Sequence, residues 1–369
     1  MKVTCLRENL KEVLDIAERI TSRNTTLPIL NHFLLTTDKG QLKISSTDLE
    51  LGFLAWFSGK ISKEGSIAIP AKLLTQFVNN LPNKKIDLEV KNYSLNLNCE
   101  NARAVIRGLN PDDFPIIPKV KNSQPLVINS KILKEAIGGV VNSCALSDAR
   151  PEITGVYLKI GSDDIKFVAT DSFRLSEKIV FKNSFKTSQV DQNIIIPART
   201  IIEVFRILND KDRDVSIFID PNQVLYDFGE SHLISRLVDG QYPDYEAVIP
   251  KDYETKVITS RTTLEEAVRL ASCFTGKLSD VILKTNLSRG EVEVFSTDVD
   301  LGEHQTNIKA DINGKDIQVV FNWKYILDGL KNIKTDEVVI DFNGDQKPAL
   351  IRPAGQSDYL YVVMPIKNK

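Results

Sequence analysis

Alternating apolar and polar residues flank three short polar breaks, which recur at nearly equal intervals along the chain. In one copy IKFVA at 165–169 precedes the break and RLSEKIVF at 174–181 follows it. Each break holds a Thr-Asp pair, at 47–48, 170–171 and 297–298. Alternation on both sides of a polar break is typical of a β-hairpin or a strand corner. Because aspartate readily accepts hydrogen bonds from neighbouring backbone N–H groups, we interpret Asp48 and Asp298 as turn residues.

A helical pattern, with a period near 3.6 residues, recurs as often as the alternating one. The first helix of each copy is predicted within 7–20, 130–144 and 261–274. A second helix follows a short apolar strand within 67–82, 194–209 and 319–333. In the first segment the apolar side chains share one arc of a helical wheel, namely Leu10, Val13, Leu14, Ile16, Ala17 and Ile20. Pro70 and Pro197 suit the first position of two second helices.

The two patterns recur in the same order, so the chain contains three copies of one unit of about 120 residues. Each copy ends on an Arg-bearing strand and a proline, as in VIRGLNPDDFPIIP at 105–118. We therefore predict three domains, at 1–121, 122–251 and 252–369. Each should hold two helices and several β-strands, which makes the predicted fold class α+β.

Composition places the chain among soluble globular proteins, since it is 42% hydrophobic and 26% charged over 369 residues. No apolar run reaches the ~18 residues that a spanning helix needs, so no membrane partner is expected. The opening MKVTCLRENLKEVL lacks the apolar core of a secretory signal. The cysteines are far apart and form no CxxC pair, at Cys5, Cys99, Cys144 and Cys273. We therefore expect reduced thiols and a cytoplasmic protein.

The charge balance gives no general attraction to nucleic acid, because 47 basic residues face 49 acidic ones and the net charge is −2. The second helices nevertheless lean basic. Their cations include Lys72, Lys84, Lys85, Arg199, Arg206, Lys324, Lys331 and Lys334. The acids among them are only Glu203 and Asp328. This sorting favours weak, sequence-independent contact with a phosphate backbone.

Signs of catalysis are missing from the sequence. The histidines stand at non-corresponding places in the repeats, at His32, His232 and His304. No P-loop or dinucleotide-binding glycine motif occurs. A metal-dependent nuclease could be imagined from Asp48, Asp171 and Asp298, but each lies in a different repeat without a paired acid. We therefore expect no enzyme activity, no metal and no cofactor.

A set of short motifs in a fixed order resembles the bacterial sliding clamps, the beta subunits of DNA polymerase III. The motifs are LPIL (27–30), STDLEL, IPAKLL, RGLNPDDFP, ATDSFRL, IIPAR, VDGQYPDY and the terminal YVVMP. The resemblance covers essentially the whole chain. It implies a processivity factor in which two chains join head to tail as a six-domain ring around duplex DNA. With no nucleotide site of its own, such a ring needs a separate ATP-dependent clamp loader.

The resemblance also implies a cleft for short peptide motifs of the replicative polymerase, the clamp loader, repair polymerases and mismatch-repair proteins. The corner after the middle Thr-Asp pair and the C-terminal tail would form it together. The implied cleft residues are Ile153, Thr170, Ser172, Phe173, Arg174, Leu175, Pro243, Ala247, Val248, Pro348, Val362, Val363, Met364, Pro365 and Ile366. Methionine and branched aliphatic side chains suit a pocket that accepts several partner sequences.

Basic positions that match the family imply the DNA contacts. These residues are Arg23, Asn24, Lys72, Arg150, Arg199 and Lys277. At Asn24 the family often has arginine, so the adjacent Arg23 is the expected substitute. The tail departs from many members because Asn368 and Lys369 follow the cleft residues. A different class of function also fits the repeats, namely a three-domain β-rich interaction scaffold that never encircles DNA.

Overall fold

A computed structural model of the chain describes residues 1–21, 26–121, 124–147, 149–208 and 212–367. Contacts between residues divide the chain into two compact units. Unit 1 comprises Met1–Ser130, Lys186–Ser188 and Arg206–Leu237. Unit 2 comprises Lys131–Phe185, Gln189–Phe205 and Val238–Lys369. The predicted DNA contacts Arg23 and Asn24, and the tail residues Asn368 and Lys369, lie outside the described residues.

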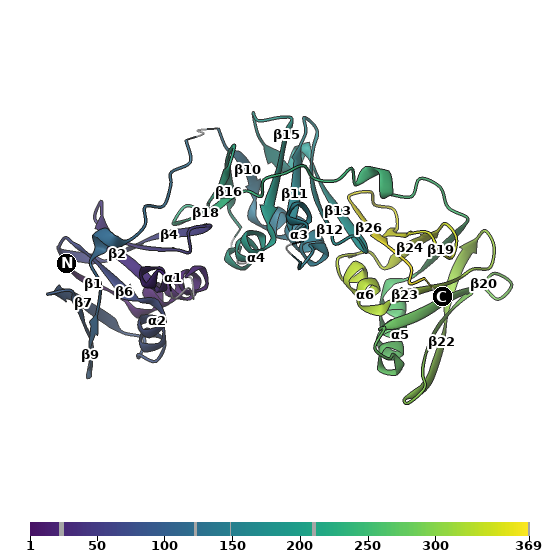
Figure 1. The fold of residues 1–369 in the computed structure, drawn as a ribbon, viewed down its shortest axis with the longest axis horizontal. Helices are drawn as coiled ribbons and strands as arrows, with labels where there is room; N and C mark the ends of the chain where they lie inside the picture. Colours follow the sequence, from purple (N-terminus) through teal and green to yellow (C-terminus); the bar gives the residue numbers. More distant parts are fainter. Residues whose placement is uncertain (22–25, 122–123, 148, 209–211, 368–369) are drawn as a thin grey trace. The chain divides into compact units, whose positions relative to one another are not determined.

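Unit 1 is built from two sheets. The smaller has the order β5 (Lys60–Lys63), β1 (Lys2–Leu6), β7 (Lys85–Lys91), β8 (Ser94–Cys99), β9 (Ala102–Arg107). The larger has the order β14 (Phe185–Lys186), β10 (Leu126–Asn129), β16 (Asp214–Asp220), β17 (Gln223–Asp227), β18 (Ser231–Arg236), β4 (Leu51–Ser58), β3 (Gln41–Thr47), β2 (His32–Asp38), β6 (Ser66–Pro70). Helices α1 (Arg7–Ile20) and α2 (Ala71–Asn79) pack against each other (Figure 1).

Unit 2 carries one long sheet of twelve strands. Its order is β15 (Gln192–Pro197), β11 (Gly155–Ile160), β12 (Asp164–Thr170), β13 (Arg174–Phe181), β26 (Tyr359–Val363), β25 (Ala349–Pro353), β24 (Glu337–Phe342), β19 (Thr255–Ser260), β22 (Gly302–Asn313), β21 (Glu291–Asp298), β20 (Asp280–Asn286), β23 (Gln318–Asn322). The helices of its C-terminal part, α5 (Arg261–Ala271) and α6 (Trp323–Lys331), pack together over a core that includes Leu264, Val268 and Ile326.

The predicted helices are confirmed, with small differences at their ends. Helix α1 has the predicted bounds, and Leu10, Leu14, Ala17 and Ile20 are its buried residues. Helices α3 (Ser130–Val140) and α4 (Ala198–Ile207) fall within the predicted segments. The proline prediction is wrong in detail. Pro70 ends β6 and is the N-cap residue of α2, and Pro197 ends β15, because both prolines still pair as strand residues.

The sheets run across the boundaries of the repeats. Strand β4 of the first repeat pairs with β18 of the second, with Leu51 opposite Ser235. Strand β13 of the second repeat pairs with β26 of the third, with Arg174 opposite Val363. The central repeat therefore contributes strands to both compact units. The boundaries near 121 and 251 stay a prediction.

None of the helices within the described ranges has the length and apolar character needed to cross a bilayer.

Candidate functional site

The corner between β12 and β13 is held by its own polar side chains. Asp171 Oδ1 accepts the backbone N–H groups of Phe173 at 2.9 Å and Arg174 at 3.0 Å. Thr170 Oγ1 accepts the Ser172 N–H at 3.1 Å and donates to the Arg174 carbonyl at 2.7 Å. Ser172 has a φ of +75°, which these bonds stabilise. The corner thus leaves Phe173 projecting, with 60% of its surface exposed.

The same device occurs in the other two repeats. Asp48 Oδ1 accepts the N–H groups of Glu50 at 3.0 Å and Leu51 at 2.8 Å. Asp298 Oδ1 accepts those of Asp300 at 3.0 Å and Leu301 at 3.2 Å. The prediction that these aspartates are turn residues is confirmed.

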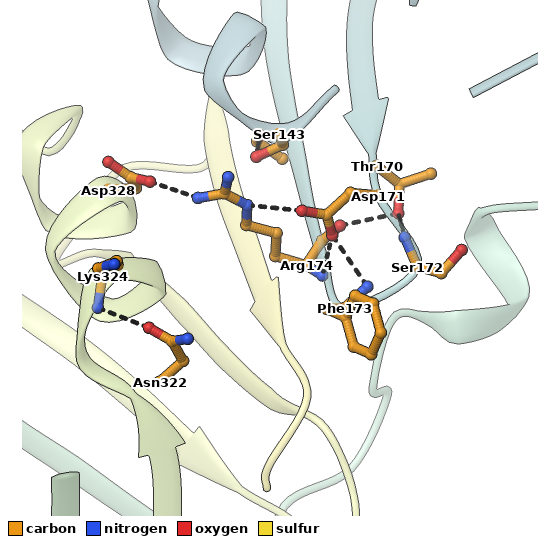
Figure 2. A network of polar contacts seen from close by, with 10 residues as sticks. Ser143, Thr170, Asp171, Ser172, Phe173, Arg174, Asn322, Lys324 and Asp328 are labelled. Carbon is orange, nitrogen blue, oxygen red and sulfur yellow. Dashed lines mark hydrogen bonds and ion pairs between the residues drawn. The ribbon is translucent and has the colours of Figure 1, made fainter. Parts of the chain in front are cut away.

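The middle copy differs because its corner carries an arginine. Arg174 Nε donates to Asp171 Oδ2 at 3.0 Å, Nη1 donates to Asp328 on α6, and the guanidinium lies 4.4 Å from the Tyr325 ring centre. Figure 2 shows Arg174 between Asp171 and Asp328, with the Phe173 ring turned away from this network. Burial alone would lower the pKa of Arg174, but Tyr361 and the two carboxylates raise it, so the side chain stays charged.

The C-terminal tail lies along this corner. Strand β26 places Val362 opposite Leu175, and the ladder continues when the Met364 N–H donates to the Phe173 carbonyl at 2.8 Å. The Ile366 N–H then donates to the Val320 carbonyl on β23 at 2.8 Å. Two segments far apart in the sequence are therefore joined by backbone hydrogen bonds, and the tail has a defined path.

Between the corner, the tail and the segment after β18 lies a cavity of ≈ 200 Å³. Its floor is apolar, since Ile153, Leu175 and Val362 are each at most 3% exposed. Phe173 and Val248 stand exposed at the rim. Space of this size and lining suits one or two apolar side chains of a ligand.

Three tyrosines fill the space beside the cavity floor. The rings of Tyr157 and Tyr242 stack with centres 4.7 Å apart, and Tyr245 meets Tyr157 edge-on at 6.2 Å. Tyr245 Oη donates to Glu177 Oε2 at 2.7 Å, and Glu177 is only 4% exposed. Burial and the neighbouring Glu177 raise the pKa of Tyr245, so its hydroxyl remains a donor at neutral pH.

We expect Tyr245→Phe to lower the free energy of unfolding by about 1–3 kcal/mol, because it leaves the buried Glu177 carboxylate without its hydroxyl partner. Urea unfolding would measure the change. Tyr253→Phe is the matched control, since Tyr253 is 49% exposed. Equal losses in the two variants would contradict a structural role for the Tyr245 hydroxyl.

Most of the predicted cleft residues line this cavity. They are Ile153, Thr170, Ser172, Phe173, Arg174, Leu175, Pro243, Val248, Val362 and Met364. Further lining comes from Arg150, Asp244 and Tyr245. Arg150 was predicted as a DNA contact, but its Nη1 donates to Ser172 Oγ at 3.3 Å at the cavity edge. Asp244 and Tyr245 could have been found from the sequence, because they directly follow the predicted cleft residue Pro243.

The remaining predicted cleft residues do not line the cavity: Ala247, Pro348, Val363, Pro365 and Ile366. Val363 does not line the cavity because successive side chains of β26 point to opposite faces of the sheet. Val363 packs in the core beneath α5 and α6, while Val362 and Met364 face the cavity. Pro365 is buried, and Ile366 is held on β23. Ala247 is exposed in the short 3-10 helix Glu246–Val248.

The predicted DNA contacts that the structure describes are exposed: Lys72, Arg150, Arg199 and Lys277. Lys72 and Arg199 are each the second residue of a second helix, α2 and α4. Lys324 holds the same position in α6, where the Asn322 side chain caps its N–H at 2.9 Å (Figure 2). The repeat itself was the signal that could have added Lys324 to the predicted set.

The three aspartates considered for a metal-dependent nuclease, Asp48, Asp171 and Asp298, all accept backbone hydrogen bonds at the strand corners. Both carboxylate oxygens of Asp171 accept hydrogen bonds, from backbone N–H groups and from Arg174. Within the described parts of the chain, no group of three or more His, Cys, Asp or Glu side chains is arranged to hold a metal ion.

Comparison with protein families matches three consecutive stretches of the chain. Residues 1–118 match the N-terminal domain of the DNA polymerase III beta subunit, residues 127–244 its central domain, and residues 246–367 its C-terminal domain. The three matches leave only short joints uncovered. They agree with the three-repeat prediction.

Individual relatives agree over their whole length. The beta sliding clamp of Synechococcus elongatus is 28% identical over all of this chain and 99% of the relative, and that of Staphylococcus epidermidis is 28% identical over all of both. The sliding clamp structure of Bacillus subtilis superimposes with a TM-score of 0.94 at 27% identity, covering both chains fully. A Pseudomonas aeruginosa clamp bound to griselimycin also has a TM-score of 0.94, at 28% identity and full coverage.

Proposed function

The chain belongs to the bacterial sliding clamps, which are the beta subunits of DNA polymerase III and act as its processivity factors. From this we propose how the cleft and the basic helices of the chain serve processive DNA synthesis. The predicted α+β fold with three clamp domains is confirmed, and the interaction scaffold that never encircles DNA is not favoured. We propose that two chains close head to tail into a ring around duplex DNA. The ring carries no reaction of its own and needs a separate ATP-dependent loader.

The cavity between the β12–β13 corner and the tail is the observation that carries the partner assignment. We propose that it captures short peptide segments of the replicative polymerase, the clamp loader, repair polymerases and mismatch-repair proteins. A branched aliphatic or aromatic side chain would fill the apolar floor at Ile153, Leu175 and Val362. Met364 at the side can change rotamer, so one cavity can accept different anchors.

Arg150 adds a charged edge to this apolar site. Its guanidinium is exposed, bonded to Glu152 at 3.0 Å and to Ser172 at 3.3 Å. A peptide carboxylate could replace the half-buried Glu152 and the exposed Ser172 as partners of this exposed guanidinium. We therefore assign Arg150 to the peptide rather than to DNA.

Duplex DNA is proposed to meet the exposed cations that begin the second helices, Lys72, Arg199 and Lys324, together with Lys277. Contacts with phosphates carry no sequence information and exchange quickly. Topology would hold the ring on DNA, so each contact can stay weak. That combination lets the ring slide.

We expect Lys72→Ala to weaken DNA association by ~1 kcal/mol or less and to lower the salt-dependence slope by about one. The reason is that one exposed cation among several supplies one phosphate contact. Binding to duplex DNA across a salt series would measure both quantities. Lys60→Ala, an exposed lysine on β5, is the control. A loss of tenfold or more would show that a single residue dominates, against the sliding proposal.

Ring closure is tested by solution mass and by DNA topology. Light scattering across a dilution series should find a species near twice 41.4 kDa. Loaded with a bacterial clamp loader and ATP, the protein should stay on circular duplex DNA and leave after the circle is cut. A monomer at every concentration, or equal retention on linear DNA, would refute the ring.

A further inference from the structure

The first repeat, together with β17 and β18, lines a groove at the place that the three tyrosines fill in the middle repeat. Leu34 on β2 and Tyr157 on β11 hold equivalent positions in the two repeats. Leu34 lies two residues after His32, which pairs with Pro70. Tyr157 lies two residues after Gly155, which pairs with Pro197. Tyr157 stacks on Tyr242. The smaller Leu34 instead lines an open cavity of ≈ 610 Å³, three times the volume of the cleft. Unit 1 contains this groove entirely.

The floor of the groove is one continuous face of the larger sheet in unit 1. Leu34, Ser45, Leu54 and His232 lie directly opposite one another across four neighbouring strands. The segment 114–120, at the end of the first repeat, forms the opposite wall. Its Ile116 is 93% exposed, although it is a large apolar residue. The groove is therefore long, open and partly apolar, as a site for an extended peptide should be.

Charges at the groove select the kind of peptide. Lys39, Lys43 and Lys119 line it, against the single carboxylate of Asp38. Asp38 Oδ2 already accepts the Trp56 indole N–H at 3.2 Å, and the Lys43 ammonium lies 5.6 Å from the Trp56 ring centre. A ligand that brings carboxylates beside an apolar or aromatic side chain would satisfy both the cations and the floor.

The corner beside this groove lacks the apolar pair found at the cleft in unit 2. The Arg236 N–H donates to the Glu50 carbonyl at 3.0 Å, as the Met364 N–H does to the Phe173 carbonyl. Glu50 and Arg236 thus replace the apolar pair Phe173 and Met364, and their side chains pair at 3.4 Å. A space of ≈ 310 Å³ remains at this corner, but Glu50 and Arg236 line it where the cleft has an apolar pair. The larger groove lies under the segment 114–120.

We propose that this groove is a second docking site, which binds an extended acidic peptide carrying a branched aliphatic or aromatic side chain. It acts independently of the cleft in unit 2. A partner that holds an acidic-apolar segment could then occupy the clamp while another protein occupies the cleft.

A designed probe tests the proposal on the full chain. The probe is a blocked hexapeptide with aspartate at alternate positions and leucine or phenylalanine between, and the control peptide has lysine for each aspartate. In a Trp323→Phe background Trp56 is the remaining tryptophan, so its fluorescence reports on the groove. We expect saturable binding of the aspartate peptide, at least about tenfold tighter than the lysine peptide.

Variants separate the groove from every other site. Leu34→Tyr introduces the tyrosine that the middle repeat has at the equivalent position, Tyr157. By filling the groove it should weaken binding of the aspartate peptide at least about tenfold. Lys43→Glu with Lys119→Glu should do the same by reversing charge, so either variant suffices if the other fails to fold. Lys60→Glu and a chain lacking residues 364–369 should bind as the parent does.

Several results would overturn the proposal. Equal binding of both peptides would remove the charge argument, and unchanged binding in Leu34→Tyr would place the peptide elsewhere. Loss of binding in the chain lacking 364–369 would place it in the cleft. Displacement by a short single-stranded DNA would assign the groove to nucleic acid. A changed solution mass in the groove variants would assign it to contact between copies of this chain.

Discussion

Deleting residues 364–369 is expected to abolish ligand binding at the cleft, with a loss of about a hundredfold or more. The deletion removes the Met364 side chain from the cavity wall and its N–H from the Phe173 carbonyl. The β12–β13 corner then keeps the segment after β18 as its neighbour at the cavity. Calorimetry with a synthetic peptide that carries a branched aliphatic anchor would measure the affinity.

Two controls make this result specific. A chain that ends at Lys367 keeps the hydrogen bonds of Met364 and Ile366 and should bind as the full chain does. Met364→Leu, which conserves volume, should lose less than about tenfold. The solution mass should be unchanged in all three. Unchanged affinity after removal of 364–369 would sink the cleft assignment, whatever the fate of the ring.

Arg174→Ala should lower the free energy of unfolding by about 2–3 kcal/mol, the second large effect. The substitution leaves Asp171, which is 15% exposed in its side chain, without its cation, and it breaks the link from the corner to Asp328 on α6. Urea unfolding followed by Trp323 fluorescence, in a Trp56→Phe background, reports on α6, which Trp323 begins.

The corner of the first repeat offers an exposed ion pair as control. Arg236 and Glu50 pair at 3.4 Å with side chains 66% and 68% exposed. Arg236→Ala should therefore cost ~1 kcal/mol or less, measured with Trp56 as the reporter. If Arg174→Ala cost no more than Arg236→Ala, the buried network would not be what ties the corner to α6.

Local features of the fold could be predicted from the sequence because neighbouring residues determine them. The apolar arc from Leu10 to Ile20 predicted α1 with the bounds that the structure has. The Thr-Asp corners could be predicted because the aspartate and the N–H groups it accepts lie within three residues of each other. The three-fold repetition needed only comparison of the chain with itself.

The cleft was predictable only in part. Resemblance pointed to both of its halves, but it could not tell Val362 from Val363, since the register of β26 decides which of them faces the cavity. The resemblance predicted Arg150 as a DNA contact, and its hydrogen bond to Ser172 at the cavity edge could not be predicted because it depends on the folded loop. Tyr245 was missed because its Glu177 partner is far away in the sequence.

The sequence by itself determined the helices, the strand corners, the three-fold repeat and the family, all of which depend on patterns within short stretches. Only the tertiary structure decided the pairing of β13 with β26, the contact of Arg174 with Asp328, and the open groove under 114–120. The physical reason is that side-chain packing and long-range strand pairing depend on volume and register between distant segments. Leu34 and Tyr157 show this, because equivalent positions in two repeats leave one space open and fill the other.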